Sequence, residues 1–141
     1  MSSNGLRTAQ HAFKLFADSK YFDRVTNKVR IISGGNGRCS AELKVEPEHQ
    51  NRMGTLHGGL TATLVDTLST VALVTHEVGV PGVTVDLHIS YLKAAKDGET
   101  VVIDCNTLKA GKTLAFLEVE IKKKETGELV AKGSHTKFIG N

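Results

Sequence analysis

The stretch "LTATLVDTLSTVALVTH", residues 60–76, is the longest apolar run of the chain. Its apolar residues recur at helical spacing, although its many β-branched residues have only middling helix propensity. A run of this length suits a helix and is too long for one strand. Because Asp66 is the only charged residue before His76, the helix is apolar or small nearly all round, and such a helix is buried on most sides. The stretch therefore predicts a central, buried helix.

Segments with the two-residue period of strands lie on both sides of this run. Upstream, "VRIIS" (29–33), a turn at "GGNG" (34–37) and the alternation over 39–45 predict a hairpin with one buried face. Although "GGNG" is similar to a phosphate loop, no Lys-Ser or Lys-Thr follows it and a strand comes next, which favours turn glycines. Downstream, further strands are expected over residues 83–92, 100–109, 113–123 and 129–138.

The N-terminal region predicts a second helix that runs to about Tyr21. Its apolar residues fall at helical spacing; they are Leu6, Ala9, Phe13 and Phe16. The chain has 141 residues, of which 40% are hydrophobic, and no Pro-rich or Gly/Ser-rich linker, so one domain over 1–141 is expected. The predicted fold class is α+β, with an antiparallel sheet of about six strands curled around the central helix and the N-terminal helix outside it.

The charge and hydropathy of the chain argue against two kinds of partner. Lys and Arg number 18 against 15 Asp and Glu, and these charges are interspersed and not massed into a basic stripe, so nucleic acid is not an expected partner. The chain has no apolar stretch of about 18 residues and no apolar core of a secretory signal near its start, so no membrane insertion is expected. We expect a cytoplasmic protein, with a mitochondrial presequence as an open alternative.

The cysteines and histidines suggest no metal site. Cys39 and Cys105 are isolated, without metal-ligand spacing, and are expected to be buried reduced thiols. The six histidines are scattered and form no H-E-x-x-H or comparable motif. We therefore expect no bound metal.

The carboxylate of Asp66 is the first candidate for chemistry. A lone charge in the middle of a buried helix is costly to desolvate unless it is paired, hydrogen-bonded or open to a wet cleft. One interpretation is structural, in which Asp66 bonds a neighbouring Thr or Ser or a loop backbone. The other is a working carboxylate, and the residue alone favours neither.

A histidine and two glycines, "HGG" at 57–59, stand where the predicted helix begins. Unpaired backbone N–H groups and the positive end of the helix dipole lie at such a position, and Gly58 and Gly59 have no side chain to keep a ligand away. The position therefore suits a donor to an oxyanion or a carbonyl oxygen. His57 by itself is more often a packed or capping residue than a catalyst. Asn51 is equally an ordinary loop residue or a second carbonyl donor.

The segments "NRMGTLHGGLTATLVD" (51–66) and "VTVDLHISYLKAAKDGE" (83–99) resemble the hotdog-fold acyl-coenzyme A thioesterases of the phenylacetate-pathway type. The resemblance covers nearly the whole chain, up to "GSHTKFIGN" (133–141), and the spacings between Asn, His-Gly-Gly and Asp hold together. It implies a hotdog fold, in which the sheet wraps around the helix of 60–76. It also implies subunits that pair along an edge strand, here 83–92, and dimers that pair again into a homotetramer.

The same resemblance implies a role for each matched residue of the site. Asp66 corresponds to the acid/base carboxylate, the N–H of Gly58 to the donor for the thioester oxygen, and Asn51 to a second polarising group. His57 is a neighbour that shapes the site. Thr84 stands where close relatives carry a Ser that helps to hold the attacking water.

Two further segments match the coenzyme A contacts of the family, and their lysines suit phosphate groups. Relatives often carry Pro at the position of Ala94, so the first of these loops is looser here. The matched residues are Tyr91, Leu92, Lys93, Ala94, Ala95 and Lys96 in the first segment and Lys109, Ala110, Gly111, Lys112, Thr113 and Leu114 in the second.

The spacing of two candidates argues for a site shared between chains. Asp66 lies eight residues after Gly58. At about 1.5 Å per residue this is roughly 12 Å along one helix, too far for both to act on one thioester carbon. If two copies of the helix run antiparallel across a two-fold axis, Gly58 of one chain meets Asp66 of the other, and two identical sites result. We therefore expect active sites shared across a dimer interface.

The residues and the resemblance together predict hydrolysis of a fatty acyl-CoA, of medium to long chain, to free fatty acid and coenzyme A. Asp66 activates water as general base, while Gly58 N–H and Asn51 stabilise the oxyanion; direct attack by Asp66 stays open. No cofactor is expected, since coenzyme A is part of the substrate and product. A serine nucleophile is not expected, because no G-x-S-x-G motif occurs. The alternatives are a hotdog enoyl-CoA hydratase and a non-catalytic acyl-CoA binding protein.

Overall fold

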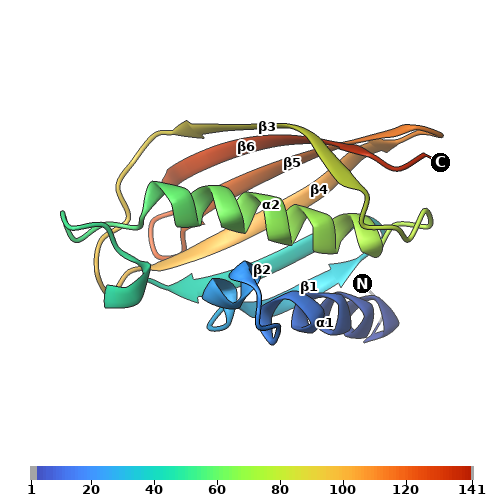
Figure 1. Cartoon of the computed structure of the whole chain (residues 1–141). Coiled ribbons are helices and arrows are strands. Elements are labelled where there is room, and N and C mark those ends of the chain that lie inside the picture. Colours follow the sequence, from blue (N-terminus) through green and yellow to red (C-terminus); the bar gives the residue numbers. More distant parts are fainter. Residues whose placement is uncertain (1–2, 141) are drawn as a thin grey trace.

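A six-stranded antiparallel sheet wraps around one long helix in the computed structural model of this protein, which describes residues 3–140 (Figure 1). The helices of this part are α1 (Ser3–Ala17) and α2 (Gly58–Val74), with short 3₁₀ helices η1 (Phe22–Thr26) and η2 (Pro47–His49). The strands are β1 (Arg30–Gly35), β2 (Arg38–Lys44), β3 (Val83–Tyr91), β4 (Thr100–Ala110), β5 (Leu114–Lys123) and β6 (Leu129–Phe138). The predicted α+β class is confirmed, and each predicted strand is present close to its expected bounds.

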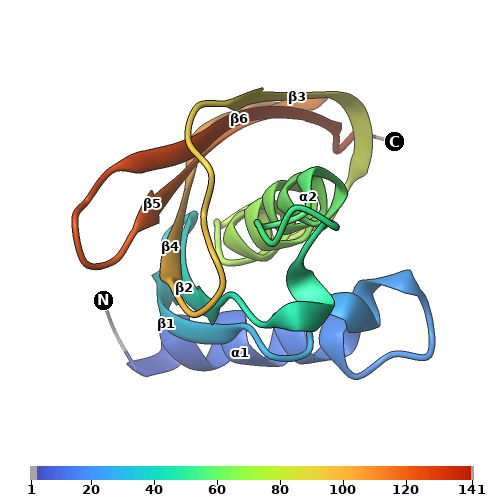
Figure 2. The same cartoon turned by 90° about the vertical axis from the view of Figure 1, so that its left-hand side faces the viewer.

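The order of the strands in the sheet is β1-β2-β4-β5-β6-β3, and all neighbours pair antiparallel. β3 follows α2 in the chain but pairs with β6, at the far edge from β1. Figure 2 shows the sheet curling over α2, from β3 on one side to β1 and α1 on the other. One edge of β3 is therefore left without a strand partner among residues 3–140.

Helix α2 forms the centre of the core, as its sequence predicts. Its apolar side chains face strands of the sheet and α1, and most are fully buried; Leu64, Val65, Leu68, Val71, Ala72 and Leu73 are 0% exposed. Burial of each large apolar side chain contributes on the order of 2 kcal/mol of transfer free energy. None of the described helices has both the length and the hydropathy needed to cross a membrane.

A glycine of β6 lets α2 approach the sheet closely. A Cβ at Gly133 would lie 2.6 Å from Cγ1 of Val65, which is closer than packed atoms come. Residues 135 and 137 follow on the same inner face of the strand, since side chains alternate between faces. The close approach therefore brings the buried residues His135 and Lys137 under the middle of α2.

The N-terminal helix is shorter than predicted. α1 ends at Ala17 and not near Tyr21, because the apolar spacing ends there and Ser19 N–H turns back to the carbonyl of Phe16. The chain then forms η1, which the sequence did not predict, and the hydroxyl of Thr67 on α2 donates to Oδ1 of Asp23 at 2.9 Å.

The cysteines agree with the sequence prediction. Cys39 and Cys105 are free and buried, and they lie opposite each other in the register of β2 and β4. Burial raises the pKa of the Cys39 thiol to about 12, with the Asp104 carboxylate adding to the effect. Such thiols are poor nucleophiles at neutral pH.

Candidate active site

The predicted catalytic residues fall into two groups within one chain. The first group lines a cleft of about 410 Å³ at the N-terminal end of α2. The cleft brings together Asn51, Gly58, Tyr91, Leu92, Lys93, Ala94 and Ala95. The second group lies further along α2, where Asp66 and Thr84 meet around His135. Because α2 is continuous from Gly58 to Val74, the eight-residue spacing places the two groups roughly 12 Å apart along the helix.

The start of α2 leaves one backbone donor open. His57 is the N-cap residue, and its Nδ1 accepts from Gly59 N–H at 2.8 Å, so the capping interpretation of His57 is confirmed. The hydroxyl of Tyr91 donates to the carbonyl oxygen of Gly58 at 2.6 Å. Within residues 3–140 no acceptor hydrogen-bonds the N–H of Gly58. This donor, at the positive end of the helix, is free to bind a carbonyl oxygen.

Asn51 organises the loop ahead of α2. Its Oδ1 accepts from the backbone N–H groups of Met53 and Thr55 at 2.9 and 3.2 Å. Its Nδ2 donates to the hydroxyl of Thr55 at 3.0 Å. One N–H of the carboxamide is left over, since an amide nitrogen carries two. Asn51 therefore holds the loop, lines the cleft and has one N–H donor left for a ligand.

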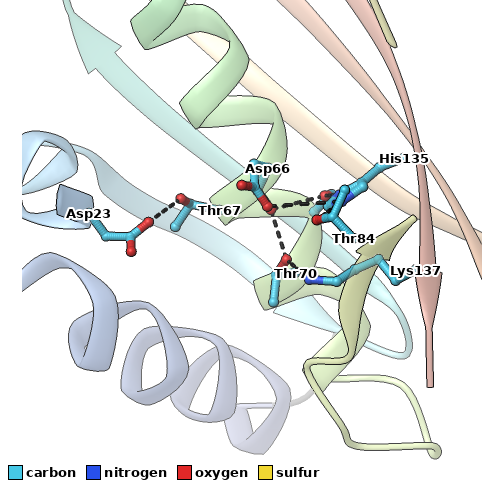
Figure 3. A network of polar contacts seen from close by, with 8 residues as sticks. Asp23, Asp66, Thr67, Thr70, Thr84, His135 and Lys137 are labelled. Atoms are coloured by element: carbon cyan, nitrogen blue, oxygen red, sulfur yellow. Dashed lines mark hydrogen bonds and ion pairs between the residues drawn. The ribbon is translucent and has the colours of Figure 1, made fainter. Parts of the chain in front are cut away.

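Asp66 lies in a group of polar residues on the inner side of the sheet (Figure 3). Its side chain is 48% exposed, and Oδ1 lies 3.9 Å from Nε2 of His135. The hydroxyls of Ser69 and Thr70 bond the main-chain carbonyl of Asp66, at 3.2 and 2.8 Å, and not its carboxylate. Among the described residues no hydroxyl or backbone N–H bonds the carboxylate, which is left available to solvent and ligands.

His135 connects helix α2 to the edge strand. Its ring is buried, with Nδ1 2.8 Å from the hydroxyl of Ser69 and Nε2 2.8 Å from the hydroxyl of Thr84. In the tautomer with the proton on Nδ1, the ring donates to the hydroxyl of Ser69, whose own proton then bonds the Asp66 carbonyl. Nε2 then accepts from Thr84, and the oxygen of Thr84 keeps its lone pairs for a water molecule.

The charge states in this group follow from burial and from nearby charges. Burial raises the pKa of Asp66; the Lys137 ammonium opposes this effect, and the Asp23 carboxylate adds to it. Burial, with help from Lys137, lowers the pKa of His135 to about 4. His135 is therefore neutral near pH 7, and its contact with Asp66 is not an ion pair.

Three members of this group, His135, Lys137 and Asp23, were not predicted from the sequence. For His135 and Lys137 the sequence pattern did contain information that could have identified them. In the strand 129–138 the period-two pattern places His135 and Lys137 on the same face as the apolar Ala131, so each is a polar residue on a buried face. Asp23 offered no such signal, since it lies on the unpredicted η1.

The two segments matched to coenzyme A contacts lie at opposite ends of the sheet. Along β6, Tyr91 lies opposite Ala131, whereas Leu114 lies opposite Phe138. Seven residues of strand separate these positions, which is roughly 23 Å at about 3.3 Å per residue. One chain therefore does not bring the segments together. In the first segment, Lys93 also forms an ion pair with Glu128 at 3.3 Å.

A six-stranded antiparallel sheet wrapped around one central helix is the architecture of the hotdog-fold thioesterases. Residues 53–130 match the thioesterase superfamily, and the chain belongs to this family. It is similar to acyl-coenzyme A thioesterase 13 of Homo sapiens, with 49% identity over 135 residues that cover 96% of each chain.

Solved structures agree with this assignment. Thioesterase superfamily member 2 of zebra fish matches with a TM-score of 0.93 and 50% identity, covering 96% of this chain and 99% of that one. A hypothetical thioesterase of Streptococcus pneumoniae, solved with coenzyme A, matches with a TM-score of 0.80 and 29% identity, covering 92% and 94%. The predicted hotdog fold and family are therefore confirmed.

Proposed function

We propose that this protein hydrolyses fatty acyl-CoA thioesters of medium to long chain to free fatty acid and coenzyme A. The observation that carries the proposal is the Asp66 carboxylate, half-exposed on a buried helix and bonded by no described hydroxyl or backbone N–H. The similarity to acyl-coenzyme A thioesterase 13 supports the substrate class. Coenzyme A in the related Streptococcus structure supports it as well.

In the proposed mechanism, Asp66 takes a proton from water as the water attacks the thioester carbon. The hydroxyl of Thr84, held by His135, accepts a hydrogen bond from the same water. Gly58 N–H and Asn51 donate to the oxygen that becomes negatively charged. The C–S bond then breaks, and the coenzyme A thiolate leaves and takes up the proton that Asp66 received, which restores the carboxylate. Direct attack by Asp66, which would form a mixed anhydride, is the alternative route.

The exposed edge of β3 supports the proposed dimer. Apolar residues along this strand and just after it are exposed, with Val83 at 68% and Val85, Tyr91 and Leu92 between 56% and 60%. An unpaired strand edge with exposed apolar side chains is a surface that natural proteins cover. A second copy of this chain, pairing through the same strand, would cover it on both copies.

The position of the two residue groups along β3 explains how such a dimer completes the site. Gly58 lies at the Tyr91 end of the strand, and Asp66 lies near the Thr84 end. Identical strands related by a two-fold axis run antiparallel, so the Tyr91 end of one faces the Thr84 end of the other. Gly58 of one chain then approaches Asp66 of its partner.

The same symmetry joins the two coenzyme A segments. The first segment begins at Tyr91, and the second ends at Leu114, which pairs with Phe138. Phe138 pairs in turn with Val83 on its other side. Pairing across β3 therefore brings the first segment of one chain toward the second segment of the other.

We further propose that two such dimers pair into a tetramer, and gel filtration tests this proposal. We also propose that the protein is located in the cytoplasm, with the mitochondrion as the alternative location, and cell fractionation tests this.

A thiol-release assay with short, medium, long and aromatic acyl-CoAs tests the proposed function. We expect free coenzyme A and free acid, with the highest kcat/KM for medium to long chains. Hydration of an enoyl-CoA without thiol release would instead indicate a hydratase. Tight acyl-CoA binding without turnover would indicate a binding protein.

Replacing the lysines of the two segments tests where coenzyme A binds. With Lys93, Lys96, Lys109 and Lys112 changed to Ala, we expect KM to rise more than kcat falls, because phosphate contacts contribute mainly to binding. Added salt should raise KM of the unmodified enzyme in the same way, since salt screens exposed charges. Lys14→Ala, on α1, is the control and should leave KM unchanged. Equal KM values for the unmodified enzyme, the four-lysine variant and Lys14→Ala would show that coenzyme A does not bind at these segments.

A further inference from the structure

Lys137 is a buried lysine that the proposed mechanism does not use. It lies on the inner face of β6 and is only 4% exposed. Its Nζ donates to the hydroxyl of Thr70 at 2.6 Å. Among residues 3–140 it has no direct ion-pair partner, and two of its three N–H donors have no acceptor. Burying a cation in this way is costly, so its position calls for a reason.

The ammonium group of Lys137 lies directly beneath the turn of α2 that carries Asp66. Thr70, which accepts from Lys137, donates in turn to the carbonyl oxygen of Asp66 at 2.8 Å. Figure 3 shows Lys137 reaching toward Thr70 on the side of Asp66 that also faces His135. In the sheet, Lys137 lies opposite Thr84. The lysine is thus connected to the Asp66 turn through Thr70 and lies on the buried side of this group of residues.

Charged and titratable groups act on the Asp66 carboxylate from two sides. From β6 come the Lys137 ammonium and the neutral imidazole of His135, and from η1 comes the carboxylate of Asp23. Strand β3 contributes the uncharged hydroxyl of Thr84. Lys137 lowers the pKa of Asp66, whereas Asp23 raises it. Burial lowers the pKa of Lys137 itself, and Asp66 opposes that effect.

We propose that Lys137 is a positioning residue for this reaction: the positive charge of its buried ammonium group, under helix α2, acts through the Asp66 carboxylate and keeps it in its ionised, proton-accepting form. The proposal rests on the proposed function, in which Asp66 is the base. Lys137 touches no substrate in this arrangement. Its second effect is on His135, which it helps to keep neutral and therefore able to accept from Thr84.

Removing the charge of Lys137 while keeping most of its unbranched side chain tests the proposal. In Lys137→Met the titration midpoint of Asp66 should rise by roughly one pH unit, the lower end of the shifts that a nearby opposite charge produces. The midpoint is read from the carboxyl carbon of Asp66 by NMR. The acid limb of the kcat/KM profile should move to higher pH by the same amount. Lys132→Met, on the exposed face of the same strand, is the matched control and should change neither quantity.

Three further variants separate charge from packing. Lys137→Gln keeps a donor for Thr70 but no charge, so it should behave like Lys137→Met and replaces it if that variant does not fold. Lys137→Arg keeps the charge and should hold the midpoint near its original pH. Asp23→Asn removes a negative charge that raises the pKa of Asp66, so the midpoint of Asp66 should move to lower pH. The amide oxygen of Asn can still accept from Thr67, so the local structure should be kept.

The proposal is overturned if Asp66 titrates at the same pH in folded Lys137→Gln as in the unmodified protein. It is also overturned if Lys137→Arg shifts the midpoint as much as the uncharged variants do, because the effect would then come from packing. If the protein is not a thioesterase, the experiments give a result that differs from failure of the Lys137 proposal. In that case no acyl-CoA releases thiol, while the NMR titration still reports whether Lys137 acts on Asp66.

Discussion

Asp66→Asn should lower kcat by on the order of a hundredfold or more and leave the fold and the oligomer intact. Asparagine preserves the shape of the side chain but cannot accept a proton from water, and loss of a general base typically costs this much. The effect should fall on kcat more than on KM, since the base acts in the transition state. Steady-state kinetics with the preferred acyl-CoA measure it, and circular dichroism and gel filtration check the structure.

The matched control for this substitution is Asp18→Asn, at the exposed end of α1, where the same chemical change should leave kcat unaltered. Near-normal turnover by folded Asp66→Asn would show that Asp66 is not the base. Trapping of an acyl group on Asp66 in the unmodified enzyme would select the covalent route over the general-base route.

Mixing two inactive variants should restore activity if the site is shared between chains. One variant lacks the donors, through Asn51→Ala and Gly58→Pro, and the other carries Asp66→Asn. Each alone should be nearly inactive. In a mixed dimer one site collects both defects, while the other receives intact donors from one chain and an intact Asp66 from its partner. With random pairing about half the dimers are mixed, so about a quarter of the original activity should return.

The structure supports the choice of proline at Gly58. This residue is the first of α2, where proline is tolerated because its missing N–H has no partner within the helix. The preceding His57 has the extended backbone that a residue before proline prefers, with φ −63° and ψ 132°. A Cβ at Gly58 would lie 3.6 Å from the ring of Tyr91, which is an ordinary contact. The substitution therefore removes one donor with little change to the helix.

The control for the mixing experiment repeats it with Asn51→Ala as the only donor-side change. Formation of mixed dimers is checked by tagging the two variants differently and purifying through both tags. If purified mixed dimers are no more active than the sum of their parents, both halves of the site lie in one chain, and the argument from the roughly 12 Å separation along α2 is wrong.

The sequence predicted the parts of the fold that depend on local patterns. The apolar run at 60–76 required a buried helix, and the lone charge within it was enough to make Asp66 a candidate for chemistry. The order of the strands depends on long-range pairing. No local pattern in 83–92 indicates that this segment pairs with 129–138. Its place at an edge of the sheet was implied by the family resemblance alone, and the strand order confirms it.

His135 shows why part of the site could not be predicted. The histidines were interpreted as scattered because they are far apart in the sequence, and Ser69 and His135 are 66 residues apart. Their contact depends on the close packing of α2 on β6, which Gly133 allows. The short helix η1, which brings Asp23 to Thr67, likewise has too few residues for a periodic signal.

The open edge of β3 has a consequence for how much enzyme a cell must hold. If each site takes residues from two chains, a separated chain has no complete site, and the active fraction follows the law of mass action. Specific activity would then fall on dilution below the dissociation constant of the dimer. Acyl-CoA bound across the interface would favour assembly, because a ligand that binds only the dimer shifts the equilibrium toward it. Substrate supply and protein abundance would together set the amount of working catalyst.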